Sequence, residues 1–172
     1  MAVSIEDIKK LRAMTGAGLA DVKKALTEAE GDFDKAKELL RERGLAIAAK
    51  RSDRETSNGC VLVKKVNDFA AIIALKCETD FVANGADFIK LTSDILDAAI
   101  AAKAHTLDEV KTLKVGDADA QAAVTQRSGI TGEKMELDGY CVLEGDNIEV
   151  YDHMNKHTLC TMAVSYTHLT LP

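Results

Sequence analysis

The chain of 172 residues lacks a long hydrophobic run and a signal-like start. No stretch approaches the roughly 20 apolar residues that a membrane-spanning helix needs, so a membrane protein is not expected. The first residues, Met1 to Lys10, form an amphipathic pattern and not an apolar core behind a charged end, which argues against a secretory signal. We therefore expect the protein to stay in the cytoplasm.

The cysteines lack the spacing of a metal site or a disulfide framework. They are far apart in the sequence, they form no C-x-x-C pair, and each falls in an apolar run that is typical of a strand. This pattern favours buried, reduced thiols over zinc ligands or disulfides. The four cysteines are Cys60, Cys77, Cys141 and Cys160.

Basic charge is not concentrated anywhere in the chain. The formal net charge is −6, and residues 55–172 hold 10 basic and 18 acidic groups, whereas residues 1–54 hold 12 basic and 10 acidic groups. Phosphate binding needs a concentrated basic face, so nucleic acid is not expected as the principal partner. The nearest approach to a basic cluster, Lys50, Arg51 and Arg54, is typical of a solvated helix end.

Familiar catalytic and cofactor motifs are also missing. Residues 1–163 contain no proline, P-loop, G-x-G-x-x-G, H-E-x-x-H or G-x-S-x-G, so neither a catalytic residue nor a cofactor is predicted. One enzyme class stays open, because His153 and His157 lie close in sequence to Cys160. A Cys-His enzyme would need Cys160 or Cys141 as a reactive thiol, and the segment shows no third group that orients the base.

The sequence begins with three amphipathic helical patterns, in which apolar residues recur at helical spacing. Ser4 is predicted to cap the first helix, Gly31-Asp32 to separate the second from the third, and Gly44 to close the third. We expect residues 1–44 to form a docking domain, since a core of this size is marginal alone. The apolar stripes are Ile5, Ile8 and Leu11; Leu19, Val22 and Leu26; and Phe33, Ala36, Leu39 and Leu40.

Residues 45–58 are predicted to be a helical extension that fades into a linker, and residues 59–163 to be a second domain. Strands, helices and turns alternate there without strict βαβ repetition, which favours an α+β fold with a largely antiparallel, helix-covered sheet. The expected strands are Cys60–Val66, Phe69–Cys77, Lys134–Leu143, Ile148–Asp152 and Thr158–Met162. The expected helices are Ala86–Lys103, Thr106–Lys114 and Ala118–Gln126, with a turn at Asn67-Asp68 and a loop at Ser128 to Gly132.

The segment Thr79 to Val82 follows a strand and precedes a long helix, so it is predicted to form a strand-to-helix corner. An exposed Phe81 beside Asp80 at such a corner suits a wedge that enters another protein. The aromatic ring gains a large burial, and the carboxylate can reach a partner's backbone or perturb its metal site. In the alternative interpretation, Thr79 is an ordinary helix cap and Phe81 is a core residue.

Two sets of residues together closely resemble the bacterial translation elongation factor Ts family. The resemblance covers roughly residues 1–163 and is weakest between Thr106 and Gln126. It implies a three-helix, ubiquitin-associated-like N-terminal domain followed by the first half of a core domain. The matching residues are Leu11-Arg12, Thr15 to Leu19, Asp21, Lys23 to Leu26, Glu28-Ala29, Gly31-Asp32 and Ala46 to Lys50, and then Thr79-Asp80-Phe81-Val82.

The resemblance implies a guanine-nucleotide exchange factor for elongation factor Tu, which performs no bond chemistry. Asp80 and Phe81 match residues that intrude beside the partner's nucleotide site and disturb its magnesium coordination. Lys9 and Lys23 fall on the surface that docks the partner's GTPase domain, while Gly132 and His153 match further contacts. The implied partner-binding residues are Thr79, Asp80, Phe81, Val82, Lys9, Lys23, Gly132 and His153.

The chain departs from the family at its end. It is much shorter than its relatives, and residues 164–172 resemble a translated sequencing adapter, so we expect them to be a non-native tail. A second functional class also stays open. A ubiquitin-associated-like binding module without exchange activity would account for residues 1–44 but not for Thr79 to Val82.

Overall fold

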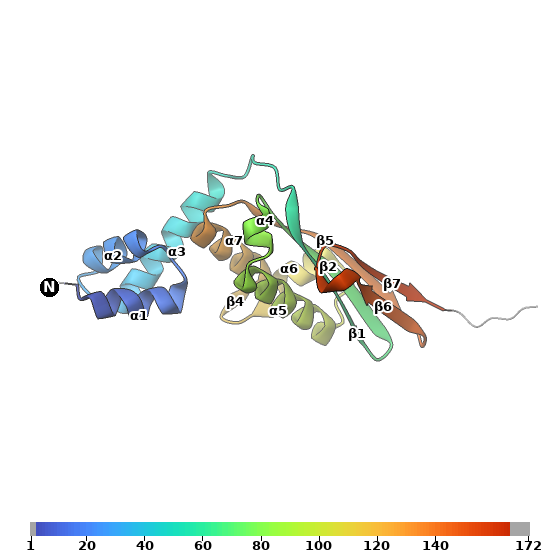
Figure 1. The fold of residues 1–172 in the computed structure, drawn as a ribbon. Helices are drawn as coiled ribbons and strands as arrows, with labels where there is room; N and C mark the ends of the chain where they lie inside the picture. Colours follow the sequence, from blue (N-terminus) through green and yellow to red (C-terminus); the bar gives the residue numbers. More distant parts are fainter. Residues whose placement is uncertain (1–2, 166–172) are drawn as a thin grey trace, which may run out of the picture. The chain divides into compact units, whose positions relative to one another are not determined.

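The computed structural model describes residues 3–165, which fall into two compact units (Figure 1). The helical unit consists of Met1–Glu55 with Thr125–Lys134, and the sheet unit consists of Thr56–Val124 with Met135–Pro172. Helices and antiparallel strands occur together, which confirms the predicted α+β class. No helix within residues 3–165 is long and apolar enough to cross a membrane.

The helical unit begins with three helices, as predicted, and side chains cap the first and the third. Ser4 Oγ accepts a hydrogen bond from the backbone N of Asp7 at 3.0 Å, and the Asp32 carboxylate accepts from the backbone N of Asp34 and Lys35. These bonds satisfy N–H groups that have no partner within the first turn of a helix. Gly16, with φ of 69°, ends the first helix in the left-handed conformation. The helices are α1 (Ile5–Thr15), α2 (Leu19–Glu28) and α3 (Phe33–Ala49).

The core of the helical unit is built from the predicted apolar stripes. Leu11, Val22 and Leu26 are fully buried. Removing side chains of this size from water contributes about 1.5–3 kcal/mol each. Ile5 and Leu19, the first residues of their stripes, are instead exposed, because each lies at the outermost turn of its helix.

Two glycines that were predicted to mark breaks lie inside helices. Gly44 is buried within α3, and Gly129 lies within α7 (Ala120–Thr131), which runs through most of the predicted loop. A Cβ atom built on Gly129 would lie 2.3 Å from the Cα of Gly44. The predicted breaks were wrong because these glycines allow two helix backbones to touch, a requirement set by tertiary packing and not by local sequence. The break comes at Gly132, after α7.

The sheet unit is organised around a three-stranded antiparallel sheet with the order β1-β2-β5. The strands are β1 (Asn58–Val66), β2 (Phe69–Cys77) and β5 (Met135–Glu144). Asn67, with φ of 55°, and Asp68 form the predicted turn between β1 and β2. The register between β2 and β5 shifts after Ala74, which faces Gly139.

One face of the sheet packs against α5 (Ala86–Ala102). Phe88 and Ile95 of α5 are buried with Phe69 and Ile73, which occupy alternate positions of β2. The hairpin of β6 (Ile148–Asp152) and β7 (Cys160–Val164) also contacts β1 and β2. Figure 1 shows α4 (Asp80–Ala83) near one end of this sheet and the β1–β2 turn at the other.

The shorter elements differ in detail from the prediction. Helix α6 (Leu107–Thr112) was expected and carries a capping box between Thr106 and Glu109. The two-residue strands β3 (Lys114–Val115) and β4 (Ala118–Asp119) and the 3-10 turn η1 (His153–Asn155) were not expected. Strand β7 ends at Val164, the first residue of the predicted tail, while residues 166–172 lie outside the described part of the chain.

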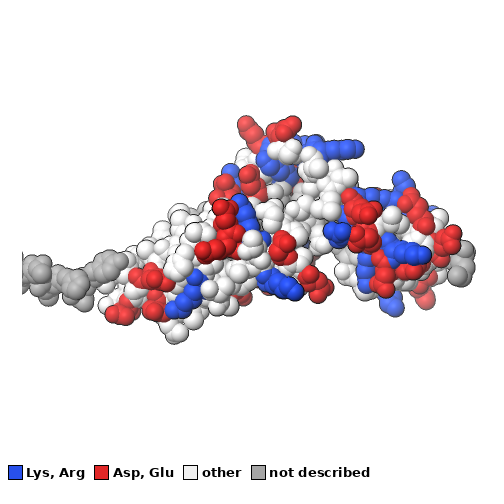
Figure 2. All heavy atoms as spheres, turned by 180° about the vertical axis from the view of Figure 1, so that it is seen from behind, with Lys and Arg blue, Asp and Glu red and all other residues white. Residues whose placement is uncertain are grey.

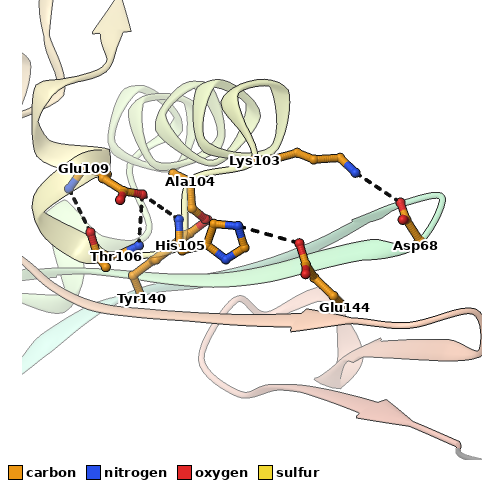
Figure 3. Close-up of polar contacts among 8 residues, drawn as sticks. All are labelled: Asp68, Lys103, Ala104, His105, Thr106, Glu109, Tyr140 and Glu144. Atoms are coloured by element: carbon orange, nitrogen blue, oxygen red, sulfur yellow. Dashed lines mark hydrogen bonds and ion pairs between the residues drawn. The ribbon is translucent and has the colours of Figure 1, made fainter.

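Polar contacts tie α5, α6 and β5 together near the β1–β2 turn (Figure 3). The Tyr140 hydroxyl donates to the carbonyl O of Ala104 at 2.8 Å, and His105 Nε2 lies 3.7 Å from the Glu144 carboxylate. The burial of Tyr140 and the nearby charge of Glu109 raise the pKa of this tyrosine to about 12. The further pairs are Lys103 with Asp68, and Glu109 with the backbone N of His105 and Thr106.

Candidate functional site

Thr79 to Val82 form the predicted corner between a strand and a helix. Strand β2 ends at Cys77, Thr79 is extended with φ of −120° and ψ of 155°, and α4 begins at Asp80. Thr79 Oγ1 accepts a hydrogen bond from the backbone N of Val82 at 3.4 Å, so Thr79 is the N-cap of α4. The corner and the cap therefore exist together.

The side chains of α4 point in two directions. Ala83 is 8% exposed and belongs to the core of the sheet unit, and Val82 packs against that core. Phe81 is 88% exposed, and Asp80 is also exposed. The alternative interpretation of Phe81 as a core residue is therefore wrong. The corner presents a carboxylate and an aromatic ring to the solvent from an anchored backbone.

Two asparagines that the sequence did not suggest hold this corner. Asn58 Nδ2, from the start of β1, donates to the carbonyl O of Glu78 at 2.9 Å. Asn84 Nδ2, at the C-cap of α4, donates to the carbonyl O of Asp80 at 2.8 Å. An asparagine directly after a short helix is a weak sequence signal, and Asn58 gives no local signal because its partner lies 20 residues away.

Lys9 and Lys23 lie in the helical unit, on α1 and α2 respectively, and both are exposed. Basic and acidic side chains are intermixed over the face drawn in Figure 2. The two lysines are accessible to a partner. Their roles stay predictions.

Gly132 and His153 occupy two irregular segments. Gly132 follows α7 with φ of 74°, and a Cβ atom there would lie 3.3 Å from Arg51 Nη1. His153 begins η1 in the sheet unit, where its Nδ1 lies 2.9 Å from the Tyr151 hydroxyl. The two rings meet edge to face with centroids 5.8 Å apart. The structure thus brings Thr79 to Val82 together in one turn, while the other predicted residues come from separate elements.

The sequence predicted no third group that orients a histidine base in this segment, and that prediction was wrong. Asp152 Oδ2 lies 2.9 Å from His157 Nδ1, so a carboxylate orients this imidazole. The thiol of Cys160, however, donates to the carbonyl O of Val61 at 3.2 Å. Burial and the neighbouring Asp152 raise the pKa of Cys160 to about 12, which holds the sulfur in its unreactive protonated form. This geometry opposes a thiol enzyme.

The other cysteines also bear on this question. Cys60 and Cys77 are buried as predicted, whereas Cys160 is only partly buried, and burial raises the pKa of Cys60 to about 11. Cys141 is exposed, contrary to the prediction, because its neighbours Tyr140 and Val142 pack against the core and side chains alternate along a strand. Residues 3–165 contain no group of three His, Cys, Asp or Glu side chains that could hold a metal ion.

Comparison with known proteins connects the corner to a family. The family described as Elongation factor TS matches residues 78–169, which is more than half of the chain and includes the whole of Thr79 to Val82. The match also overlaps the predicted tail, so the assignment of residues 164–172 as non-native stays a prediction.

Individual relatives extend the similarity through the helical unit. Elongation factor Ts of Bacteroides fragilis is 68% identical over 162 residues, which are 94% of this chain and 49% of the relative. That of Parabacteroides distasonis is 66% identical over 163 residues, 95% of this chain and 50% of the relative. That of Porphyromonas gingivalis is 51% identical over 154 residues, 89% of this chain and 56% of the relative. The chain spans about half the length of these curated relatives.

Proposed function

Because the chain belongs to the elongation factor Ts family, we propose that it acts in translation elongation as a guanine-nucleotide exchange factor for elongation factor Tu. It would accelerate GDP release without making or breaking a covalent bond. As functional ranges we propose a partner-docking domain over residues 1–44, a linker over 45–58 and the first half of an exchange core over 59–163.

The exposure of Phe81 on an anchored turn is the observation that carries this proposal. An aromatic ring that is 88% exposed adds no core burial to the folded chain, yet its backbone is held by a cap and by two asparagines. Such a ring can gain its burial inside a partner, where a central interface aromatic contributes roughly 1–4 kcal/mol.

Asp80 and Phe81 would act together as a wedge beside the partner's nucleotide site. The ring would occupy space between elements of the partner, and the carboxylate of Asp80 would disturb the partner's magnesium coordination. Loss of the magnesium ligands weakens the hold on the diphosphate. The chain would bind nucleotide-free partner more tightly than GDP-bound partner, and by linkage GDP and the chain would weaken each other's binding by the same factor.

Residues outside the wedge would supply affinity and orientation. We assign Lys9 and Lys23 to docking of the GTPase domain, since both are exposed cations on neighbouring helices. We assign Gly132 and His153 to further contacts, and Thr79 and Val82 to the base of the wedge, where they cap and anchor α4. Exposed charges of this kind act chiefly on the association rate, which should fall with ionic strength.

The test is the release of a fluorescent GDP from elongation factor Tu in stopped flow. We expect the 172-residue chain to accelerate release and Phe81→Ala to reduce the acceleration severalfold or more, with unchanged thermal stability. Val66→Ala is the matched control, because Val66 is a partly exposed apolar residue at the far end of the sheet. No acceleration at saturating chain would end the proposal.

The second candidate is a ubiquitin-associated-like binding module without exchange activity. It is favoured by the separate core of the helical unit and by the exposed apolar residues Ile5, Met14 and Leu19 on that unit. Such a module would bind elongation factor Tu without changing the rate of GDP release, and Phe81→Ala would not alter its affinity. The same stopped-flow measurement, combined with a binding titration, separates the two functions.

A further inference from the structure

Helix α4 is too short to hold its own shape. It has four residues, and the backbone bonds that close it are Ala83 N to Thr79 O at 3.2 Å and Asn84 N to Asp80 O at 2.9 Å. Isolated helices of this length are not stable in water, since nucleation fixes several residues for one hydrogen bond. The orientation of Asp80 and Phe81 must therefore be fixed by contacts beyond these two backbone bonds.

Side chains on both sides of the corner provide these groups. Asn58 donates to the carbonyl of Glu78, and Asn84 donates to the carbonyl of Asp80, so the two amides hold the residues on either side of Thr79. Asn58 is itself fixed, because it is paired with Cys77 at the end of the β1–β2 ladder. The Cys77 thiol adds a weak bond to the carbonyl of Thr79 at 3.2 Å.

We propose that Asn58 and Asn84 are positioning residues of the exchange site, which fix the direction in which Asp80 and Phe81 leave the sheet unit. This inference rests on the proposed function, because it assigns the two amides a part in exchange. Neither residue needs to touch the partner. Each acts through a carbonyl of the corner, and its loss changes how often the wedge is in the correct orientation.

The chemistry of the amide explains why asparagine serves at both positions. Its Nδ2 donates to a carbonyl without adding charge beside the carboxylate of Asp80. Aspartate has the same shape but only accepts hydrogen bonds, so it would place a carboxylate oxygen against a carbonyl oxygen. Asn58→Asp and Asn84→Asp therefore test the donor and not the volume of the side chain.

A double-mutant cycle on GDP release tests the assignment. We expect Asn84→Ala to slow exchange by about fivefold, the effect of one ordinary hydrogen bond. In a Phe81→Ala background the same change should have a smaller effect, below about twofold, because only the carboxylate of Asp80 is left to orient. Asn147→Ala is the matched control, because Asn147 is an exposed asparagine in the turn before β6. It should change the rate of GDP release neither in the unchanged chain nor in the Phe81→Ala background. Independent, multiplying effects of Asn84→Ala and Phe81→Ala would overturn the proposal.

A second measurement needs no partner and separates this inference from the proposed function. Backbone ¹⁵N relaxation on the full chain should give order parameters of about 0.85 for Asp80 and Phe81, falling toward about 0.6 in Asn58→Asp and Asn84→Asp but not in Asn147→Ala. If the chain accelerates no exchange while these values fall, the function is wrong and the amides still position the corner. Unchanged order parameters in both variants would show that the amides do not position it.

Discussion

Because of the contact between Gly44 and Gly129, we predict that Gly129→Ala destabilises the protein, although helix propensity alone would make it stabilising. Replacing an exposed glycine inside a helix by alanine stabilises a protein by about 1 kcal/mol. Gly129→Ala would place its Cβ 2.3 Å from Cα and 2.7 Å from the carbonyl carbon and oxygen of Gly44. These are backbone atoms that cannot rotate away, so α3 and α7 would have to separate locally.

The two glycines of this contact are not equivalent, which supplies a matched control. A Cβ on Gly44 would lie 3.4 Å from the Cα of Gly129, an ordinary van der Waals distance. Overpacking costs about 1–3 kcal/mol, and the higher helix propensity of alanine offsets part of this cost. We therefore expect Gly129→Ala to lower the free energy of unfolding by about 1–2 kcal/mol. Gly44→Ala should leave the free energy of unfolding unchanged or raise it by up to about 1 kcal/mol.

Urea unfolding monitored by circular dichroism measures both changes, and a fit with separate transitions is needed if the two units unfold independently. In a chain of this length, 1 kcal/mol corresponds to a shift of about 2–4 °C in Tm. Gln126→Ala, at an exposed position of α7, controls for changes in helix propensity alone. Stabilisation by Gly129→Ala equal to that by Gly44→Ala would refute the close packing of the two helices.

Three further predictions concern titration and reactivity. The folded-state pKa of Tyr140 is raised to about 12, so its contribution to stability is complete below pH 10 and is lost as the pH rises from about 10 to 12. Tyr140→Phe should lower the free energy of unfolding by about 1 kcal/mol at pH 8 and should flatten its alkaline decline in urea titrations. Hydrogen bonds from the backbone N–H groups of Lys35 and Asp34 lower the pKa of Asp32. Asp32→Ala should therefore destabilise the chain at pH 7, and the difference in free energy of unfolding between the two proteins should shrink as the pH falls below 3.8. Iodoacetamide at pH 7.5 should label Cys141 and leave Cys160 unlabelled, which mass spectrometry of peptides from the labelled folded chain would show. Rapid labelling of Cys160 would instead support a thiol enzyme.

Local signals predicted most of the secondary structure. Ser4 and Asp32 cap helices because their side chains bond backbone groups two or three residues away, and the turn at Asn67-Asp68 fixes a hairpin between adjacent strands. These interactions are complete within a few residues, so a sequence pattern contains all the information that they need. The same holds for Thr79, whose cap defines the corner.

Contacts between distant residues could not be predicted in this way. Gly44 and Gly129 look like helix ends because glycine usually lowers helix stability, and only the α3–α7 contact shows that their missing Cβ atoms are needed. The small β3–β4 hairpin had a usable signal in Gly116-Asp117, although its strands are too short for periodicity to reveal. Asn58 had none, since its partner Glu78 becomes a neighbour only when β1 pairs with β2.

The direction of Phe81 follows from its place in the turn of α4 and not from its hydrophobicity. Successive side chains around a helix are separated by about 100°, so a single turn that directs Val82 and Ala83 to the core must direct Asp80 and Phe81 away from it. Burying a phenylalanine would contribute about 1.5–3 kcal/mol, and the free chain does not gain this at position 81. Asn84 ends α4, and its side chain holds the carbonyl O of Asp80, so the turn keeps this orientation. The ring is thus kept exposed because Val82 and Ala83 of the same turn pack into the core, and a partner that buries it would recover a free energy that the fold of this chain leaves unused.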